Sequence, residues 1–153
     1  MKSMLYSRKE LVLIAFMGLV LTSCATLTPS GLAKEPKNYL QKEVSIEGMV
    51  TALVTIPFTD IRLFLLSDKV ASVPVVSTKA PRTDVPVTLK AWVAGFAVPV
   101  GQWGESEQRY LRDKLVELGI LKDDVSDVVA GLLIAALKGL GSASERLYIL
   151  VDL

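Results

Sequence analysis

The sequence predicts an α+β fold in which five β-strands share one core and two helices precede the last strand. Three observations support this prediction. Four segments between residues 44 and 93 are rich in β-branched and other apolar residues, and the longest alternates apolar with polar positions. Two segments within 105–140 carry apolar residues at helical spacing, and a final alternating segment spans 147–153. The chain is therefore expected to form one domain.

The first strand is expected over 44–56, where Pro57 ends it. Gly48 lies inside this strand and is the expected place for a bulge or bend, because so long a strand must coil to stay on one core. Pro74 indicates that the third strand is short or at an edge, since proline donates no backbone hydrogen bond. The other strands before the helices are expected over 61–67, 70–76 and 85–93.

The helical insertion is expected over 105–140, with a first helix to Leu118 and a second helix over 124–140. The second helix is apolar around nearly its whole circumference, so it either sinks into the domain or meets a membrane or a partner. Trp103, just before the insertion, either plugs the core or offers an exposed aromatic contact. The residues expected to contact a partner are Trp103, Leu132, Leu133 and Leu137.

The strand patterns include Val44-x-Ile46-x-Gly48-x-Val50, Phe64-Leu65-Leu66-x-Asp68 and Val87-x-Leu89-x-Ala91-x-Val93. Together with the order of elements, they resemble the OB-fold proteins of the bacterial envelope, which belong with the tRNA-anticodon-binding-like domains. The resemblance covers 38–96 and 147–153 and implies a small five-stranded Greek-key barrel. Helices stand where that family usually has a hairpin loop, so its binding face is not carried over. Another small barrel or sandwich with a helical hairpin is the alternative.

The first 23 residues have the order of a signal peptide. A basic start precedes an apolar run over 11–21, and Thr22 and Ser23 separate that run from Cys24. The run is shorter than the roughly 20 residues that a transmembrane helix needs. Leu21-Thr22-Ser23-Cys24 resembles the lipobox of bacterial lipoproteins. This resemblance implies cleavage before Cys24 and acylation, with palmitate among the acyl groups, of its sulfur and its new amino group.

Lipidation is the expected role of Cys24, the only cysteine, because the chain has no histidine to serve a catalytic thiol as base. Several acyl chains, each contributing about 0.8 kcal/mol per buried CH₂, would hold the protein on a membrane. Ala25 follows the cysteine, and in the enterobacterial families that the motif resembles, a residue other than Asp there implies the outer membrane, facing the periplasm. Residues 24–43 are expected to be a flexible tether, and 44–153 the domain.

Charge argues against a nucleic-acid partner. Removal of residues 1–23 takes three basic residues and one acidic residue from totals of 17 and 16, which leaves 14 and 15. A nearly neutral domain lacks the positive surface that nucleic-acid binding requires. Arg62 and Phe64, expected on the outer face of the second strand, are interpreted as ordinary strand residues.

The sequence offers few groups for catalysis or metal binding. No Ser-x-x-Lys motif follows Cys24, and Ser67-Asp68-Lys69 is interpreted as a turn. Asp123, Asp124 and Asp127 suit the start of a helix better than a calcium site, which needs six or more oxygen ligands. We therefore expect no enzyme activity, no cofactor and no metal. The predicted function is a lipid-anchored binding or accessory module for another envelope component; the alternative is a membrane-associated or homo-oligomeric subunit acting through its helical insertion.

Overall fold

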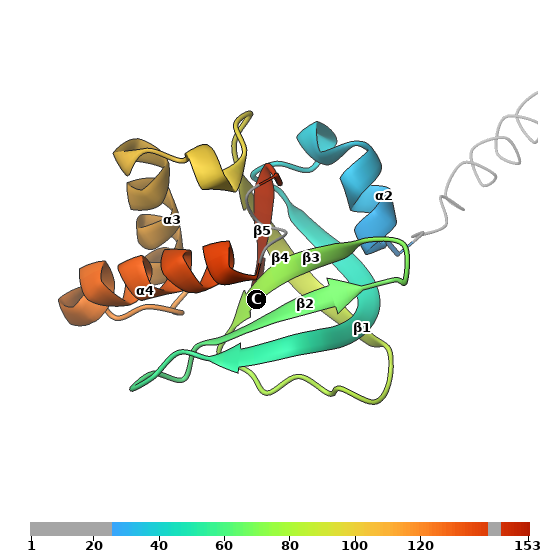
Figure 1. Cartoon of the computed structure of the whole chain (residues 1–153), viewed down its shortest axis with the longest axis horizontal. Coiled ribbons are helices and arrows are strands. Elements are labelled where there is room, and N and C mark those ends of the chain that lie inside the picture. Colours follow the sequence, from blue (N-terminus) through green and yellow to red (C-terminus); the bar gives the residue numbers. More distant parts are fainter. Residues whose placement is uncertain (1–25, 141–144) are drawn as a thin grey trace, which may run out of the picture.

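The computed structural model describes residues 26–140 and 145–153. Its strands form a closed barrel in the order β1-β2-β3-β5-β4 (Figure 1). Neighbouring strands are antiparallel except β3 and β5, which are parallel. This arrangement confirms the predicted OB-like barrel with two helices between the fourth and fifth strands. The strands are β1 Glu43–Thr55, β2 Arg62–Ser67, β3 Ser72–Ser77, β4 Val87–Gly95 and β5 Tyr148–Asp152.

Strand β1 closes the barrel because it pairs with β4 along its first half and with β2 along its second half. The change of partner occurs at Gly48, where a Cβ atom would lie only 2.9 Å from both Leu66 Cγ and the Ser67 carbonyl oxygen. A glycine is therefore required there by close packing. The register slips between Thr51 and Val54, and Ala52 between them has a left-handed φ of 52°. The bulge thus lies beyond Gly48.

The barrel interior is filled by side chains from all five strands. Phe64 belongs to this interior and is fully buried, so its expected place on the outer face is wrong. Its neighbour Leu63 points to the other side of the sheet, as the period of a strand requires. The interior residues of the strands are Ile46, Val50, Phe64, Leu66, Val73, Val75, Ala91, Val93, Tyr148 and Leu150.

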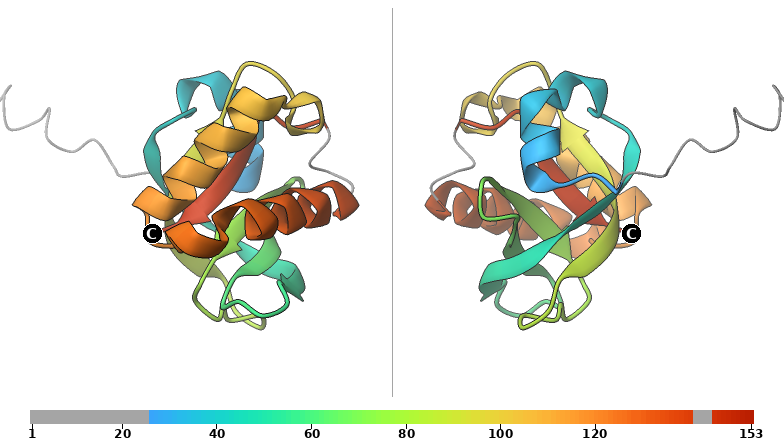
Figure 2. Two further views of the ribbon diagram at one scale, coloured as in Figure 1. Left: turned by 90° about the vertical axis from the view of Figure 1, so that its left-hand side faces the viewer. Right: turned by 90° about the vertical axis from the view of Figure 1, so that its right-hand side faces the viewer.

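Helices α3 (Glu105–Glu117) and α4 (Ser126–Gly139) cover one outer wall of the barrel, as the left view of Figure 2 shows. Both predicted helices are confirmed. A second core joins them to the wall, and it includes Leu63 on β2 and Ile149 on β5. Within the described part of the chain, no helix is long and apolar enough to cross a membrane. The described residues also contain three short 3₁₀ turns: η1 Pro36–Asn38, η2 Val100–Gln102 and η3 Asp123–Val125.

The expected tether is wrong from Leu27 onward, because that part of the chain packs on the barrel. Leu27 pairs with Ile46 of β1, and helix α2 (Pro29–Lys34) follows at once. Leu32 of α2 is completely buried against the barrel interior. Pro29 starts this helix, since proline at the first helical position has a suitable φ and needs no hydrogen-bond partner.

Replacing Leu32 by alanine should lower the free energy of unfolding by about 2 to 5 kcal/mol, because it opens a cavity at a buried site. Lys34→Ala, at an exposed position of the same helix, should change it by less than about 0.5 kcal/mol. Urea denaturation of the mature chain measures both values. Equal, small effects would show that α2 does not contribute to the folded domain.

Asp68, in the turn between β2 and β3, joins that turn to α2. Its carboxylate accepts backbone hydrogen bonds from Ser30 at 2.8 Å, Val70 at 3.1 Å and Ala71 at 2.8 Å. Burial raises the pKa of the Asp68 carboxyl, but hydrogen bonds from Ser30, Ala71 and Val70 outweigh this and hold the pKa well below its ordinary value of 3.8. The ionised carboxylate therefore fixes the first turn of α2 beside the β2–β3 turn.

The stability that Asp68 contributes should depend on pH. Because its folded-state pKa is depressed, this contribution is fully present above the unfolded-state pKa and is lost as the pH falls toward the folded-state pKa. Asp68→Asn should therefore be less stable than the natural chain at about pH 7, and the difference should shrink at about pH 2.5. Urea denaturation at both pH values tests this; a difference independent of pH would contradict it.

Candidate functional site

Cys24, the expected lipidation site, lies outside the described residues. Of the four residues expected to contact a partner, the structure places three in the core: Trp103 is 6% exposed, and Leu133 and Leu137 are completely buried. The expectation that these three form a contact surface is therefore wrong. Leu132 is 47% exposed and is the one member of the set that can reach a partner.

Trp103 holds the start of the helical insertion against the barrel. Its indole N–H donates a hydrogen bond to the Val98 carbonyl at 3.1 Å, and its ring meets Phe96 edge-on with centroids 5.6 Å apart. Phe96 in turn meets Tyr110 of α3 edge-on at 4.8 Å. Such aromatic contacts stabilise packing beyond the area that they bury. Trp103 is thus a structural residue, the first of the two alternatives left open by the sequence.

Helix α4 presents its most apolar positions to the barrel and a weaker apolar stripe to the outside. Leu133 and Leu137 belong to the core between α4 and the barrel wall. On the other side, Val128 is 72% exposed and lies one turn from Leu132. Gly131 stands between them with open space around it, so no contact within the described chain requires a glycine there.

A cleft of about 730 Å³ lies between the β1–β2 loop and the connection from α3 to α4. We call it the hairpin cleft. Ile61 and Leu121 are almost completely buried and give it an apolar floor. The residues that line it are Phe58, Thr59, Asp60, Ile61, Thr78, Gly119, Ile120, Leu121, Lys122, Asp124 and Val129.

Phe58 is the most unusual residue of the hairpin cleft. Its side chain is fully exposed, and its φ of 61° lies in the left-handed region that a bulky residue rarely adopts. The turn imposes this backbone: the Thr59 hydroxyl donates to the Ile56 carbonyl at 3.0 Å and accepts from the Ile61 N–H at 3.1 Å. Such a conformation costs on the order of 1 to 3 kcal/mol and occurs disproportionately at functional sites.

Polar groups of both signs surround the apolar floor of the hairpin cleft. Asp60 and Asp124 supply negative charge and Lys122 supplies positive charge. Arg62 links the β1–β2 loop to the end of β3, since its guanidinium donates hydrogen bonds to the carbonyls of Asp60 at 3.3 Å and Thr78 at 3.0 Å. A hydrogen-bonded, strained loop with an apolar tip and a mixed polar rim is suited to binding another molecule.

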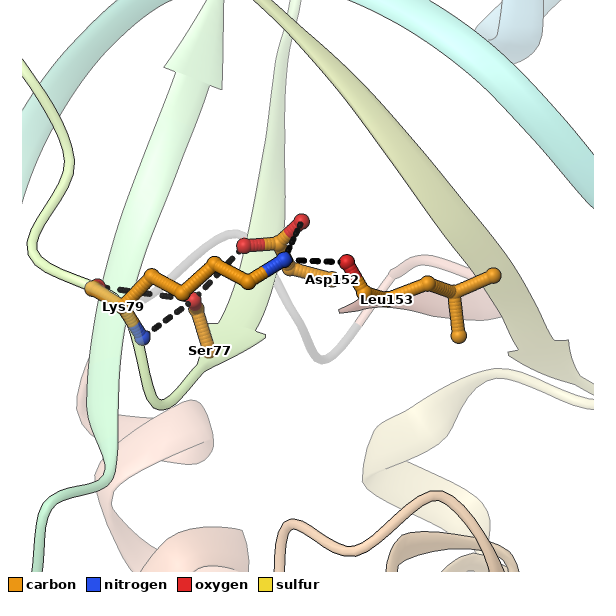
Figure 3. A network of polar contacts seen from close by, with 4 residues as sticks. All are labelled: Ser77, Lys79, Asp152 and Leu153. Carbon is orange, nitrogen blue, oxygen red and sulfur yellow. Dashed lines mark hydrogen bonds and ion pairs between the residues drawn. The ribbon is translucent and has the colours of Figure 1, made fainter.

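A second polar cluster lies at the ends of β3 and β5 (Figure 3). The Ser77 hydroxyl donates to Asp152 Oδ2 at 2.7 Å and accepts from the Lys79 backbone N–H at 2.9 Å. The Lys79 ammonium lies 3.9 Å from Asp152 Oδ1 and donates to the Leu153 carbonyl. Ser77 is 1% exposed, so a substrate cannot reach its hydroxyl, and the cluster ties β3 to β5.

Over residues 26–140 and 145–153, no group of three or more His, Cys, Asp and Glu side chains is arranged to hold a metal ion. Asp127 lies in the first turn of α4, as expected, and its carboxylate also accepts a hydrogen bond from Arg112 of α3 at 2.7 Å. This ion pair joins α3 to α4 at the surface, where such a pair contributes little to stability.

No protein-family model matches the chain, and no curated protein matches its sequence. The candidate site therefore depends on the geometry of the hairpin cleft. Sequence reasoning missed it, although Phe58 stands out as an aromatic residue in the polar turn Pro57-Phe58-Thr59-Asp60 between two strands.

Proposed function

We propose that this protein is a lipid-anchored, non-enzymatic binding module of the bacterial envelope that holds an envelope partner in the hairpin cleft. The anchor is Cys24, and the domain that binds is the barrel with its helical insertion. The lipobox-like order before Cys24 supports the anchor. In the enterobacterial families that the motif resembles, Ala25 after the cysteine favours the outer membrane, on the periplasmic side.

The observation that carries the binding role is Phe58. The fully exposed side chain of Phe58 gains no stability from burial when the chain folds, and its left-handed backbone conformation lowers stability. Aromatic residues are enriched where proteins bind one another, because one rigid side chain buries a large area. Contact with a partner would remove this side chain from water and use the conformation that the turn imposes.

A second candidate function uses the outer side of α4. Its exposed apolar stripe, Val128 and Leu132 with Gly131 between them, could contact a membrane surface or a second copy of the chain. A glycine with open space around it weakens a helix by about 1 kcal/mol relative to alanine, which favours a role in close approach by another molecule. The protein would then be a membrane-associated or homo-oligomeric subunit.

Phe58→Ser should abolish most of the partner binding and leave the fold intact, because the side chain contacts solvent. Losses of about 2 kcal/mol or more, roughly thirtyfold in affinity, are typical when an aromatic anchor is removed. Val70→Ser is the matched control, since Val70 is exposed in the β2–β3 turn at the other end of β2.

The measurement is quantitative mass spectrometry of the proteins that copurify with the detergent-extracted lipoprotein and with each variant. Loss of a partner with Phe58→Ser alone supports the hairpin cleft. If both variants keep every partner, while Leu132→Ser loses one, the site lies on α4 instead.

A further inference from the structure

The folded domain begins very close to the proposed anchor. The Leu27 N–H donates to the Ser45 carbonyl at 3.1 Å, and its carbonyl accepts from the Glu47 N–H at 2.9 Å, so Leu27 is fixed to β1. Only Ala25 and Thr26 separate it from Cys24. At about 3.3 to 3.6 Å per residue, the three steps from Cys24 to Leu27 span at most about 11 Å. An acylated Cys24 would therefore keep the barrel against the lipid headgroups.

The same side of the barrel carries the β2–β3 turn. Ser30, three residues after Leu27, donates its backbone N–H to Asp68 in that turn at 2.8 Å. The right view of Figure 2 faces this side, with α2 in front. These hydrogen bonds thus hold Leu27, near the point of attachment, and the β2–β3 turn on the same side of the barrel.

The tip of the β2–β3 turn has the character of a membrane contact. Val70 is 84% exposed, and no neighbouring side chain covers it. Lys69 beside it is exposed and has a left-handed φ of 74°, imposed by the hydrogen bonds of the turn to Asp68 and Ser67. A small apolar side chain can enter the headgroup region while an adjacent lysine pairs with anionic lipid headgroups.

We infer that the β2–β3 turn, with Lys69 and Val70 at its tip, rests on the lipid surface while the hairpin cleft points away from it. This inference rests on the proposed anchor at Cys24. The cleft lies at the opposite end of β2, because β2 begins beside the β1–β2 loop at Arg62 and ends at Ser67. Five steps along a strand at about 3.3 Å each place the two ends roughly 17 Å apart. The partner would therefore meet the protein from the aqueous side.

Site-directed spin labelling tests this orientation. The full chain is expressed with Val70→Cys or, as the control, Phe58→Cys, and an acylated Cys24 cannot react with the label. Each purified lipoprotein is reconstituted in vesicles of phosphatidylethanolamine and phosphatidylglycerol. We expect the label at position 70 to be shielded several-fold from a water-soluble nickel relaxation agent and to be accessible to oxygen. The label at position 58 should remain open to the nickel agent.

Three outcomes distinguish the proposed orientation from its alternatives. Shielding at position 70 alone supports the inference. Shielding at position 58, or at neither position, in a protein whose mass shows acylation overturns the orientation and leaves the anchor standing. A mass without acyl groups on Cys24 overturns both the anchor and the inference built on it.

Discussion

Once residues 1–23 have been removed, a chain with Cys24→Ala is expected to move from the membrane fraction to the soluble fraction almost completely. A single acyl chain gives only marginal and reversible membrane binding, so the several chains proposed on Cys24 would be needed for stable attachment. Without the sulfur, no acyl chain can be added there. The fold should be unaffected, because the described domain begins beyond Cys24 and has its own core.

The experiment needs a control for the apolar run over 11–21, which would itself hold an uncleaved chain on the membrane. Cys24→Ala is therefore also expressed behind a cleavable secretory leader that replaces residues 1–23. Flotation on a density gradient measures the membrane-bound fraction, and intact mass gives the new amino terminus. If the leader-free variant still floats with membranes, the outer stripe of α4 or a membrane-bound partner holds the protein.

Leu133→Ala is expected to cost about 2 to 5 kcal/mol of unfolding free energy, whereas Leu132→Ala should cost less than about 1 kcal/mol. The two residues are adjacent in sequence, but a helix turns by about 100° between them, so they face different surroundings. Leu133 is completely buried against the barrel wall, and Leu132 is half exposed. Truncation of Leu133 leaves a cavity, while truncation of Leu132 removes an apolar surface that is already in contact with solvent.

Urea denaturation of both variants measures this difference, and an unchanged m-value would show that the extent of unfolding is the same. A larger loss for Leu132→Ala than for Leu133→Ala would mean that α4 packs on the barrel by another face. The pair therefore also tests which side of α4 remains free for a membrane or a second copy.

The strands and α3 could be predicted because each buries one side and so repeats its apolar residues at a fixed period, and α4 could be predicted from its long apolar run, which ends at glycines. The predicted strand over 44–56 and the observed β1, Glu43–Thr55, differ by one residue at each end. The observed α3, Glu105–Glu117, begins at the predicted residue. The prediction that the strands form a barrel depended on the order of the elements along the chain and not on any single motif.

Other features could not be predicted because they leave no repeating pattern of apolar residues in the sequence. Helix α2 is too short to show a periodic pattern of apolar residues. The sequence also does not distinguish a proline that starts a helix from one that breaks a helix. The apolar residues of α4 run around the whole helix, so the sequence did not show which of Leu132 and Leu133 faces the core. Phe58 is exposed because of the local turn geometry, which one aromatic letter does not reveal.

The most direct test of the account is photo-crosslinking in living cells from position 58. Phe58→benzoylphenylalanine keeps an aromatic side chain at the tip of the β1–β2 loop, and Val70→benzoylphenylalanine is the control at the other end of β2. We expect one recurrent protein adduct from position 58 that position 70 does not give. Binding of a partner in the hairpin cleft would be contradicted if position 58 gave no protein adduct above the control, or if it gave only adducts with lipid.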